Sequence, residues 1–440
     1  MPTTYSYSWK EDLDYTVFKN KDYFATGVSL DGTTTTEYVD ARGNKIASSV
    51  LHGNDEIVTQ FEFDDLAQLE KVINPLKLVT SYRYNDLGQV VSETHPDRGL
   101  TTTTYDPAGN VSTITTPAGT TTLSYDHNRL IGKSLSDATS ALLYNVAFEY
   151  GTAADAGDNA LGRLKKITQG QASNPVLVEE FKYDELGNNV WNEKTIANPK
   201  SNATETFVTQ SHYDSFGRLM KLIYPDGENV NYGYSDLGSL LTIQTTKPGM
   251  IAGDIISDIH YDGFDNIKEI QYGNGTTTTY DYHQYTRSMS TFATEAKAKS
   301  ISSFGQVQHK SFDYNEREMI QSVSAEVDGE MFQPMGSNGS AAPMNYTHTF
   351  TYDGFNRLTE AVLSDYDFGN NTEAYRVTMA FDDAGRITEN TAIDANASSL
   401  VSSGGLNRDW TYGYKSGAHQ IDFIQQTGAP SRQEYDFNTS

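Results

Sequence analysis

The side chains with the greatest chemical reactivity are scattered along this chain, and their spacing rarely supports catalysis. Nine histidines occur among 440 residues, and none forms an H-E-x-x-H pair or another close metal-ligand spacing. His212 and His260 each precede a recurring tyrosine, so in a strand they would point to the face opposite that ring. A solvated or structural histidine is therefore a better interpretation of both than a metal ligand.

The acidic residues give only fragments of a site. Asp155, Asp158 and Asn159 form part of a calcium-loop pattern without its bidentate glutamate. Adjacent carboxylates, as in Asp64-Asp65 and Asp382-Asp383, point to opposite faces of a strand, which disfavours a general acid and base pair. The sequence has no P-loop, dinucleotide fingerprint or G-x-S-x-G. We therefore expect a protein that is not an enzyme and has no cofactor or metal.

Composition limits the partners and the compartment. The net charge of -26 repels phosphate backbones and anionic lipid, so we expect neither nucleic acid nor a membrane surface as a partner. Cysteine is absent, which excludes disulfides and thiol nucleophiles. No apolar run approaches the roughly 18 residues of a membrane helix. The opening stretch has no basic-then-apolar signal, so any export is not signalled there.

The elements expected to carry these residues are β-strands. The chain has 29 tyrosines, 19 phenylalanines and 35 glycines, and it has threonine runs at 33–36, 101–104 and 276–279. Such residues favour pleated, half-buried strands with frequent turns. Helical periodicity is scarce, and the longest candidate, Thr291 to Ser300, predicts at most one or two helical turns within an insertion.

One short pattern recurs along the chain. Tyr-Asp/Asn-x-x-Gly occurs at Tyr84, Tyr105, Tyr183 and Tyr213, more often than composition alone would produce. Tyr84 follows Phe63 by 21 residues, and Tyr105 follows Tyr84 by the same interval. Looser copies begin at Phe63, Tyr125, Tyr234, Tyr261, Tyr314, Tyr352, Phe381 and Tyr414. The sequence therefore predicts an array whose unit is 21 residues.

Each part of the unit has a physical role. The aromatic residue ends a strand and places its ring on the core face, the adjacent Asp or Asn bonds turn amides, and the Gly accepts the positive φ of a tight turn. A second turn, such as Pro225-Asp226-Gly227, follows half a unit later, so each unit is predicted to be a β-hairpin. The predicted structural residues are Tyr84, Gly88, Tyr105, Asp106, Gly109, Tyr183, Asp184, Gly187, Tyr213, Asp214, Gly217, Tyr234, Gly238, Tyr261, Asp262, Tyr352, Asp353, Phe381 and Gly385.

Units such as YDPAGNVSTITTPAG and YDSFGRLMKLIYPDG resemble the YD repeats of the Rhs family. The family includes bacterial polymorphic toxins, the B and C components of insecticidal toxin complexes, and teneurins. The resemblance implies an all-β, YD-repeat array of antiparallel β-hairpins that forms a large curved or spiralling sheet, either a β-cocoon around a C-terminal toxin or an open segment of one. Accumulated strand twist also disfavours a flat sheet of about thirty strands.

The resemblance and the repeat boundaries together predict the domain organisation. We expect residues 1–37 to form N-terminal strands, as a degenerate repeat, and residues 38–440 to form the repeat array. The array breaks off after Tyr435, where Thr439 replaces the turn glycine, and we interpret this as a cut from a longer chain. Asp106-Pro107-Ala108-Gly109 matches the Asp-Pro-x-Gly of the family's autoproteolytic region, but it lies within an ordinary repeat, which favours a structural role.

Five longer intervals carry polar insertions, which predict surface or lumenal loops. They are Thr152 to Ala160, Lys194 to Thr209, Ala293 to Lys310, Val327 to Tyr346 and Asn390 to Asn407. A recognition role is open to them because binding residues often lie on loops of rigid scaffolds.

Three functions from different classes remain open. The first is a structural segment of a secreted, bacterial Rhs-type shell that encloses and helps deliver a toxin or effector encoded beyond this segment. The second is a cell-surface module that binds glycan or protein, and the third is a carbohydrate-active enzyme whose site is assembled across strands. For the first, the expected partners are the cargo and the remaining repeats. We also expect self-association through exposed sheet edges.

Overall fold

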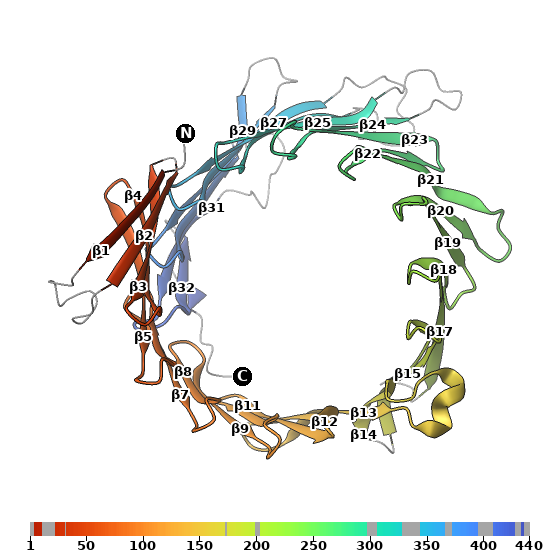
Figure 1. The fold of residues 1–440 in the computed structure, drawn as a ribbon. Coiled ribbons are helices and arrows are strands. Elements are labelled where there is room, and N and C mark those ends of the chain that lie inside the picture. Colours follow the sequence, from red (N-terminus) through yellow and green to blue (C-terminus); the bar gives the residue numbers. More distant parts are fainter. Residues whose placement is uncertain are drawn as a thin grey trace. The chain divides into compact units, whose positions relative to one another are not determined.

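The protein is built almost entirely from antiparallel β-strands. The computed structural model describes residues 4–10, 23–30, 32–171, 174–198, 203–296, 306–327, 344–365, 372–394, 408–426 and 433–434. These residues form 33 strands of one sheet and a single short 3-10 helix (Figure 1). The prediction of an all-β array of hairpins is confirmed.

The chain divides into two compact units. Unit 1 comprises Met1–Leu100, Asp281–Ala293 and Gln306–Ser440, and unit 2 comprises Thr101–Tyr280 and Thr294–Gly305. The predicted boundary between residues 37 and 38 stays a prediction, and both residues lie within one strand, β3 (Thr33–Asp40).

Unit 1 contains the first eight strands and the last nine. The first eight are β1 Thr4–Lys10, β2 Tyr23–Leu30, β3 Thr33–Asp40, β4 Lys45–His52, β5 Asp55–Phe63, β6 Leu69–Ile73, β7 Val79–Tyr84 and β8 Val90–His95. The last nine are β25 Gln306–Tyr314, β26 Ile320–Val327, β27 Met344–Tyr352, β28 Leu358–Asp365, β29 Thr372–Phe381, β30 Ile387–Asp394, β31 Arg408–Tyr414, β32 Ile421–Gln426 and β33 Gln433–Glu434.

Unit 2 contains the central strands, and the boundaries between the units fall within three further strands. The central strands are β10 Val111–Thr116, β11 Gly119–Asp126, β12 Arg129–Asp137, β13 Leu142–Tyr150, β14 Leu164–Gln171, β15 Asn174–Tyr183, β16 Asn189–Ala197, β17 Thr204–Tyr213, β18 Leu219–Ile223, β19 Asn229–Tyr234, β20 Leu240–Thr246, β21 Gly253–Tyr261 and β22 Ile267–Tyr272. The boundary strands are β9 Gly99–Tyr105, β23 Thr276–Tyr282 and β24 Met289–Ala296.

Each strand pairing in the described part of the chain joins strands that are consecutive in sequence. The register runs antiparallel throughout, for example Tyr5 opposite Val28 in β1 and β2, and Val230 opposite Thr245 in β19 and β20. The turns therefore alternate between the two edges of the sheet. We call the turn after each repeat aromatic a Tyr corner, and the turn on the opposite edge a half-unit turn.

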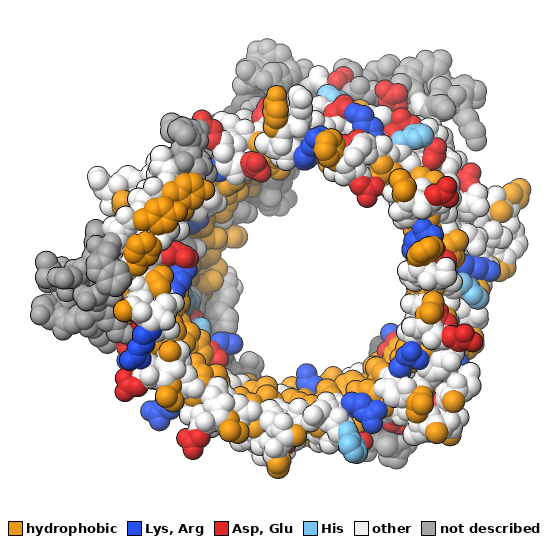
Figure 2. Space-filling view, viewed as in Figure 1, with side chains coloured by type: hydrophobic (Ala, Val, Ile, Leu, Met, Phe, Trp, Pro, Cys, Tyr) orange, Lys and Arg blue, Asp and Glu red, His pale blue; other side chains and the backbone are white. Residues whose placement is uncertain are grey.

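The core of this sheet is thin. Buried apolar side chains among the described residues are few and mostly small, such as Ala47, Val146, Val230 and Ala392, and the repeat tyrosines are only half-buried. The rings pack between neighbouring strands of one layer and not against a second sheet. In the described residues, the strands that pack closely on each other are consecutive in sequence. Hydrophobic side chains gather on the concave face of unit 2 along β11 to β14 (Figure 2).

Two sequence predictions about local structure are wrong. Residues 289–296 form strand β24 and not a helix, because Thr291, Phe292 and Thr294 suit a pleated sheet, where the ring of Phe292 stacks on Phe312 with centroids 6.1 Å apart. The remaining candidate helix residues, 297–300, lie outside the described residues.

Lys194 to Thr209, predicted as a loop, mainly extends a hairpin. Strands β16 and β17 pair from Trp191 opposite Gln210 to Ala197 opposite Thr204. Cross-strand threonine pairs such as Thr195 and Thr206, with Oγ1 atoms 2.9 Å apart, compensate for the low hydrophobicity. The insertion Thr152 to Ala160 instead contains the 3-10 helix η1 (Ala153–Asp158), which begins with a capping box from Thr152 and Asp155.

Candidate functional site

Most of the repeated Tyr corners are held by the polar residue that follows the aromatic ring, which is usually an aspartate. In the corner after Tyr213, Asp214 Oδ1 accepts hydrogen bonds from the backbone amides of Phe216 and Arg218, both at 2.9 Å. The amide of Gly217 donates to the carbonyl of Asp214 at 3.0 Å, which closes a tight turn. The predicted residues Asp106, Asp184, Asp262 and Asp353 accept the corresponding amide bonds in their own corners.

These bonds favour the charged form of the acid. In Asp106 and Asp184 the side-chain bonds from Asn110 and Asn188, together with turn amides, hold the carboxyl pKa below its ordinary value despite some desolvation. Because the fixed carboxylate satisfies amides that have no ladder partner, the acid shapes the corner and is not poised as a proton-transfer group.

The turn glycines adopt the left-handed backbone conformation. Six of them have φ between 77° and 99°: Gly88, Gly109, Gly187, Gly217, Gly238 and Gly385. At the same position in looser copies, Ala67, Asp265, Glu318 and Asn356 adopt φ between 61° and 66°. The corner geometry is therefore kept even where the sequence provides no glycine, at the expense of local strain.

The tyrosine hydroxyl groups connect consecutive repeats. Tyr234 Oη donates to the carbonyl of Leu219 at 3.0 Å, and Leu219 is the residue that pairs with Tyr213 one repeat earlier. Tyr261 Oη donates in the same way to Leu240, the partner of Tyr234, at 2.8 Å. Tyr84, Tyr150, Tyr183, Tyr314, Tyr352 and Tyr414 also donate to a carbonyl of an earlier repeat. Among the other predicted aromatics, Tyr105 and Tyr213 end strands β9 and β17, and Phe381 ends β29.

A β-bulge accompanies these corners, and the sequence did not predict it. In β17 and β18, His212 pairs with Lys221 but Tyr213 pairs with Leu219, so the return strand carries one extra residue. The same shift occurs before Tyr84, Tyr183, Tyr234, Tyr261, Tyr314, Tyr352, Phe381 and Tyr414. Bulges increase local twist and bend a strand, so they introduce curvature at a regular interval.

Arginine at the position after the turn residue forms a clasp between repeats. Arg357 Nε donates to Asp353 Oδ2 at 2.6 Å, and its Nη1 donates to the carbonyl of Asp382 in the next corner at 2.7 Å. Its guanidinium also lies over the ring of Phe381, 5.0 Å from the centroid. Arg386 makes the same three contacts with Asp382, Ala418 and Tyr414. The sequence signal for this clasp was the Arg that follows the turn residue, but its role was not apparent.

Within unit 1, Tyr corners of the late repeats contact half-unit turns of the early repeats. The corners follow Tyr314, Tyr352 and Tyr414. They face four half-unit turns, which lie before β3 and after β4, β6 and β8. We call this contact the junction. Its partners are about three hundred residues apart, for example 284 between Thr33 and Arg317.

The first part of the junction is centred on the hydroxyl group of Thr33. Thr33 Oγ1 donates to the carbonyl of Gly354 at 2.9 Å and accepts from Arg317 Nη2 at 2.6 Å. Its remaining contact is His52 Nδ1 at 2.8 Å. Since the single hydroxyl proton is used on Gly354, His52 must donate from Nδ1. Arg317 Nη1 also donates to the Gly354 carbonyl and to Asn356 Oδ1.

The second part of the junction is a carboxylate held by a backbone segment. Asp97 Oδ1 accepts from the amides of His419 and Gln420, and Asp97 Oδ2 lies 2.8 Å from His419 Nδ1. On the other side of that imidazole, Asn74 Nδ2 lies 2.7 Å from His419 Nε2. Burial opposes the charge on Asp97, but the bonds from His419 and Gln420 lower the pKa of the carboxyl overall.

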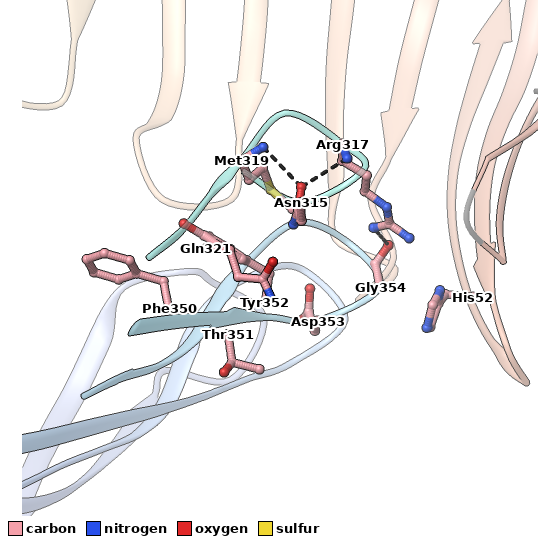
Figure 3. Close-up of a pocket in the computed structure, with 10 residues that line it drawn as sticks. All are labelled: His52, Asn315, Arg317, Met319, Gln321, Phe350, Thr351, Tyr352, Asp353 and Gly354. Atoms are coloured by element: carbon pink, nitrogen blue, oxygen red, sulfur yellow. Dashed lines mark hydrogen bonds between the residues drawn. The ribbon is translucent and has the colours of Figure 1, made fainter. Parts of the chain in front are cut away.

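A cavity of about 270 Å³ lies beside the first part of the junction and brings together tyrosine, histidine and arginine. Figure 3 shows Arg317 and Gly354 approaching from the late repeats and His52 from an early strand. This combination would suit a catalytic pocket. However, Tyr352 Oη bonds the carbonyl of Ile320, and Asp353 bonds turn amides and Arg357. The polar groups hold backbone corners in place.

The remaining chemical candidates lie apart from one another. The carboxylate of Asp155 bonds Lys165 at 2.5 Å and the amide of Thr152, contacts that lower its pKa to about 2. His212 and His260 are exposed on their strands. Among the residues that the structure describes, no group of three or more His, Asp or Glu is arranged to hold a metal ion. Within the same ranges, no helical segment has the length and apolar character required to cross a lipid bilayer.

Comparison with known proteins relates the repeat to one family. A model of the RHS Repeat family matches residues 84–121 and 105–140. No curated protein matches the sequence. Both matched stretches begin at a repeat tyrosine, Tyr84 or Tyr105, so the family model follows the same unit as the corners described above.

Solved structures of toxin complexes are similar to nearly the whole chain. A crystal structure of TcdB2-TccC3-Cdc42 aligns with a TM-score of 0.73 at 16% identity, covering 95% of this chain and 22% of that chain. A crystal structure of TcdB2-TccC3 aligns with a TM-score of 0.63 at 17% identity, covering 95% and 25%. A Photorhabdus luminescens Tc holotoxin pore gives 0.62 at 16% identity, covering 94% and 24%. The chain thus spans about a quarter of the length of the solved chains it matches, and at this identity the likeness shows the fold.

Proposed function

The chain is a YD-repeat protein of the Rhs type with the fold of a structural shell, and from this premise we propose that it is a wall segment that encloses and helps deliver a toxin or effector. The observation that carries the proposal is the repeated corner, in which Tyr, Asp, Gly and Arg bond the backbone of their own and the neighbouring repeats. Using so many side chains for internal bonds is typical of a scaffold. The cargo is proposed to be encoded beyond this segment.

The single-layer sheet supports a containing role. A sheet without a second layer leaves both faces accessible, and in unit 2 the concave face collects apolar side chains (Figure 2). Large exposed apolar surfaces on soluble proteins usually mark an interaction site. Such a face suits an incompletely folded polypeptide, which has apolar groups of its own to bury.

We propose that the role is structural and not enzymatic. The cavity that combines His52, Arg317 and Tyr352 has its polar atoms bonded to Thr33, Gly354 and Ile320, so proton transfer there would break the junction. The proposed location is outside the producing bacterial cell. The high negative charge fits this location because it favours solubility and disfavours nucleic acid binding.

Enclosure can be tested by protease protection. The parent gene would be expressed through residue 440 and into the sequence that follows it, and the downstream segment would be followed during digestion. We expect this segment to survive much longer when attached to the wall than when expressed alone. The matched control is the same protein with His419→Ala, which removes a junction contact. Equal digestion of the attached and the free segment, with the wall intact, would contradict the proposal.

A further inference from the structure

Consecutive Tyr corners of unit 2 present large apolar side chains to solvent. The residue before the turn glycine, or before its replacement, is Leu186, Phe216, Leu237 and Phe264 in four successive corners. Their exposed fractions are 66%, 83%, 97% and 66%. We call these four residues the corner row. Two strands separate adjacent corners, so at about 4.8 Å per strand the row extends on the order of 30 Å along one edge of the sheet.

The same position in a late repeat of unit 1 is covered. Phe355, which occupies the place of Phe216 in its own corner, is half-buried and meets the ring of His52 edge-on, with centroids 6.4 Å apart. His52 ends β4 at a half-unit turn. Gly354, beside Phe355, approaches His52 so closely that a Cβ there would overlap the imidazole ring. Unit 1 therefore shows directly that a Tyr-corner edge of this array fits a half-unit-turn edge.

Unit 2 carries the complementary edge as well. Its half-unit turns expose Leu142 and Leu143 at the start of β13, with 55% and 62% of each residue accessible. Between β20 and β21 they expose Met250 and Ile251, with 69% and 97% accessible. Single exposed apolar residues are ordinary, but a row on one edge of a sheet with two apolar pairs on the opposite edge is typical of interaction surfaces.

We propose that the corner row of unit 2 docks on the half-unit-turn edge of unit 2 in a second copy of this chain. The contact continues in trans the type of interface that unit 1 forms internally. It differs from strand pairing at a sheet edge because side chains at turns, and not backbone groups, form it. The two surfaces are different, so the association is head-to-tail and does not close after two copies.

Sedimentation velocity with two complementary variants tests this. The corner variant is Leu186→Ser with Phe216→Ser and Leu237→Ser, and the turn variant is Leu142→Ser with Leu143→Ser, Met250→Ser and Ile251→Ser. We expect the unaltered chain to form a ladder of oligomers as its concentration rises, and each variant alone to remain monomeric. An equal mixture should form dimers only, because each variant retains the surface that the other has lost.

Two controls keep the test specific. Ile131→Ser with Met220→Ser removes comparably apolar groups from the face of the sheet, where they are 39% and 38% exposed, and should leave the ladder unchanged. Circular dichroism of every variant should match that of the unaltered chain because the altered residues are exposed. A monomeric unaltered chain would overturn the proposal. So would an unaffected corner variant, or a mixture that contains no dimer.

Discussion

At the scale of single residues, the tyrosine hydroxyl group is the most repeated contact of the fold. In Tyr84, Tyr183, Tyr261, Tyr314 and Tyr352, burial raises the side-chain pKa, and each hydroxyl also donates to a carbonyl. An ionised phenolate cannot donate, so both burial and bonding favour the neutral form in the folded state.

This predicts an alkaline limit to stability. Because the folded-state pKa is raised, the tyrosines contribute fully below the unfolded value of about 10, and their contribution is lost as pH rises through the folded value. The melting temperature should therefore fall as the pH rises above about 10. Tyr314→Phe with Tyr352→Phe should melt lower at neutral pH but show a shallower alkaline decline. An equally steep decline in that variant would show that other groups cause it.

The left-handed turn position gives a reciprocal pair of substitutions. Gly385 has φ of 80°, and no atom of another residue lies close to the point that a Cβ would occupy, so Gly385→Ala adds backbone strain and little else. We expect it to lower the free energy of unfolding by about 1 kcal/mol. Ala67 has φ of 62°, so Ala67→Gly should relieve backbone strain and raise the free energy of unfolding. The gain should be smaller than the loss in Gly385→Ala, because glycine loses more conformational entropy on folding. Urea unfolding would measure both, and shifts of the same sign would contradict this account.

The position of the turn residues could be predicted from the sequence because the signal is local. Tyr, Asp and Gly lie within five residues and each has a strong turn preference. The left-handed conformation of Ala67 and Glu318 could not be predicted in the same way, since neither residue type favours it. There the pairing of the neighbouring strands fixes the backbone conformation of the corner, and the residue at the turn position adopts it.

At the scale of elements, the arginine clasp joins one hairpin to the next. Arg357→Lys keeps the positive charge but loses the planar fork that bonds Asp353 and the Asp382 carbonyl at once. We expect a loss of about 1 kcal/mol in the free energy of unfolding and faster amide exchange in β29. Arg98→Lys is the matched control, because that side chain is 66% exposed and pairs only at the surface with Glu93. Equal effects of the two changes would rule out the clasp.

The strands were predictable where aromatic and β-branched residues alternate, and the errors occurred where they do not. The segment 291–300 contains Ala and Glu, which suggested a helix, but in its described part, 291–296, a place in the sheet outweighs a weak helix preference. The polar hairpin of β16 and β17 was missed for a related reason. Its threonines bond across the strands and not to a core, so its hydrophobicity gives no signal.

At the scale of the whole molecule, the junction of unit 1 is a non-local contact that the sequence did not reveal. Thr33, Asn74 and Asp97 resemble ordinary turn residues, and their partners lie hundreds of residues away. Local pattern cannot specify such a pairing. The corners that form it were predicted, but nothing in their local sequence indicates which turns they meet.

The junction should be sensitive to acid. The pKa of Asp97 is lowered in the folded state, so its contribution is present above the unfolded value of about 3.9 and is lost as pH falls through the folded value. Asp97→Asn should mimic this at neutral pH and speed amide exchange at His419 and Gln420 by about tenfold or more. Asp236→Asn, at an exposed corner of unit 2, should leave that exchange unchanged. Unaltered exchange in Asp97→Asn would mean that the carboxylate does not hold the segment.

Pairing between chain neighbours alone has a consequence for how such a protein changes over generations. A tandem duplication of one unit would add two strands that pair with each other and with their chain neighbours, so the other strand pairings are kept. Strand pairing alone is thus no obstacle to lengthening the array. An addition between the early and late repeats of unit 1 must still let Asp97 meet Gln420, so gains and losses of units there should occur in sets that restore the same meeting.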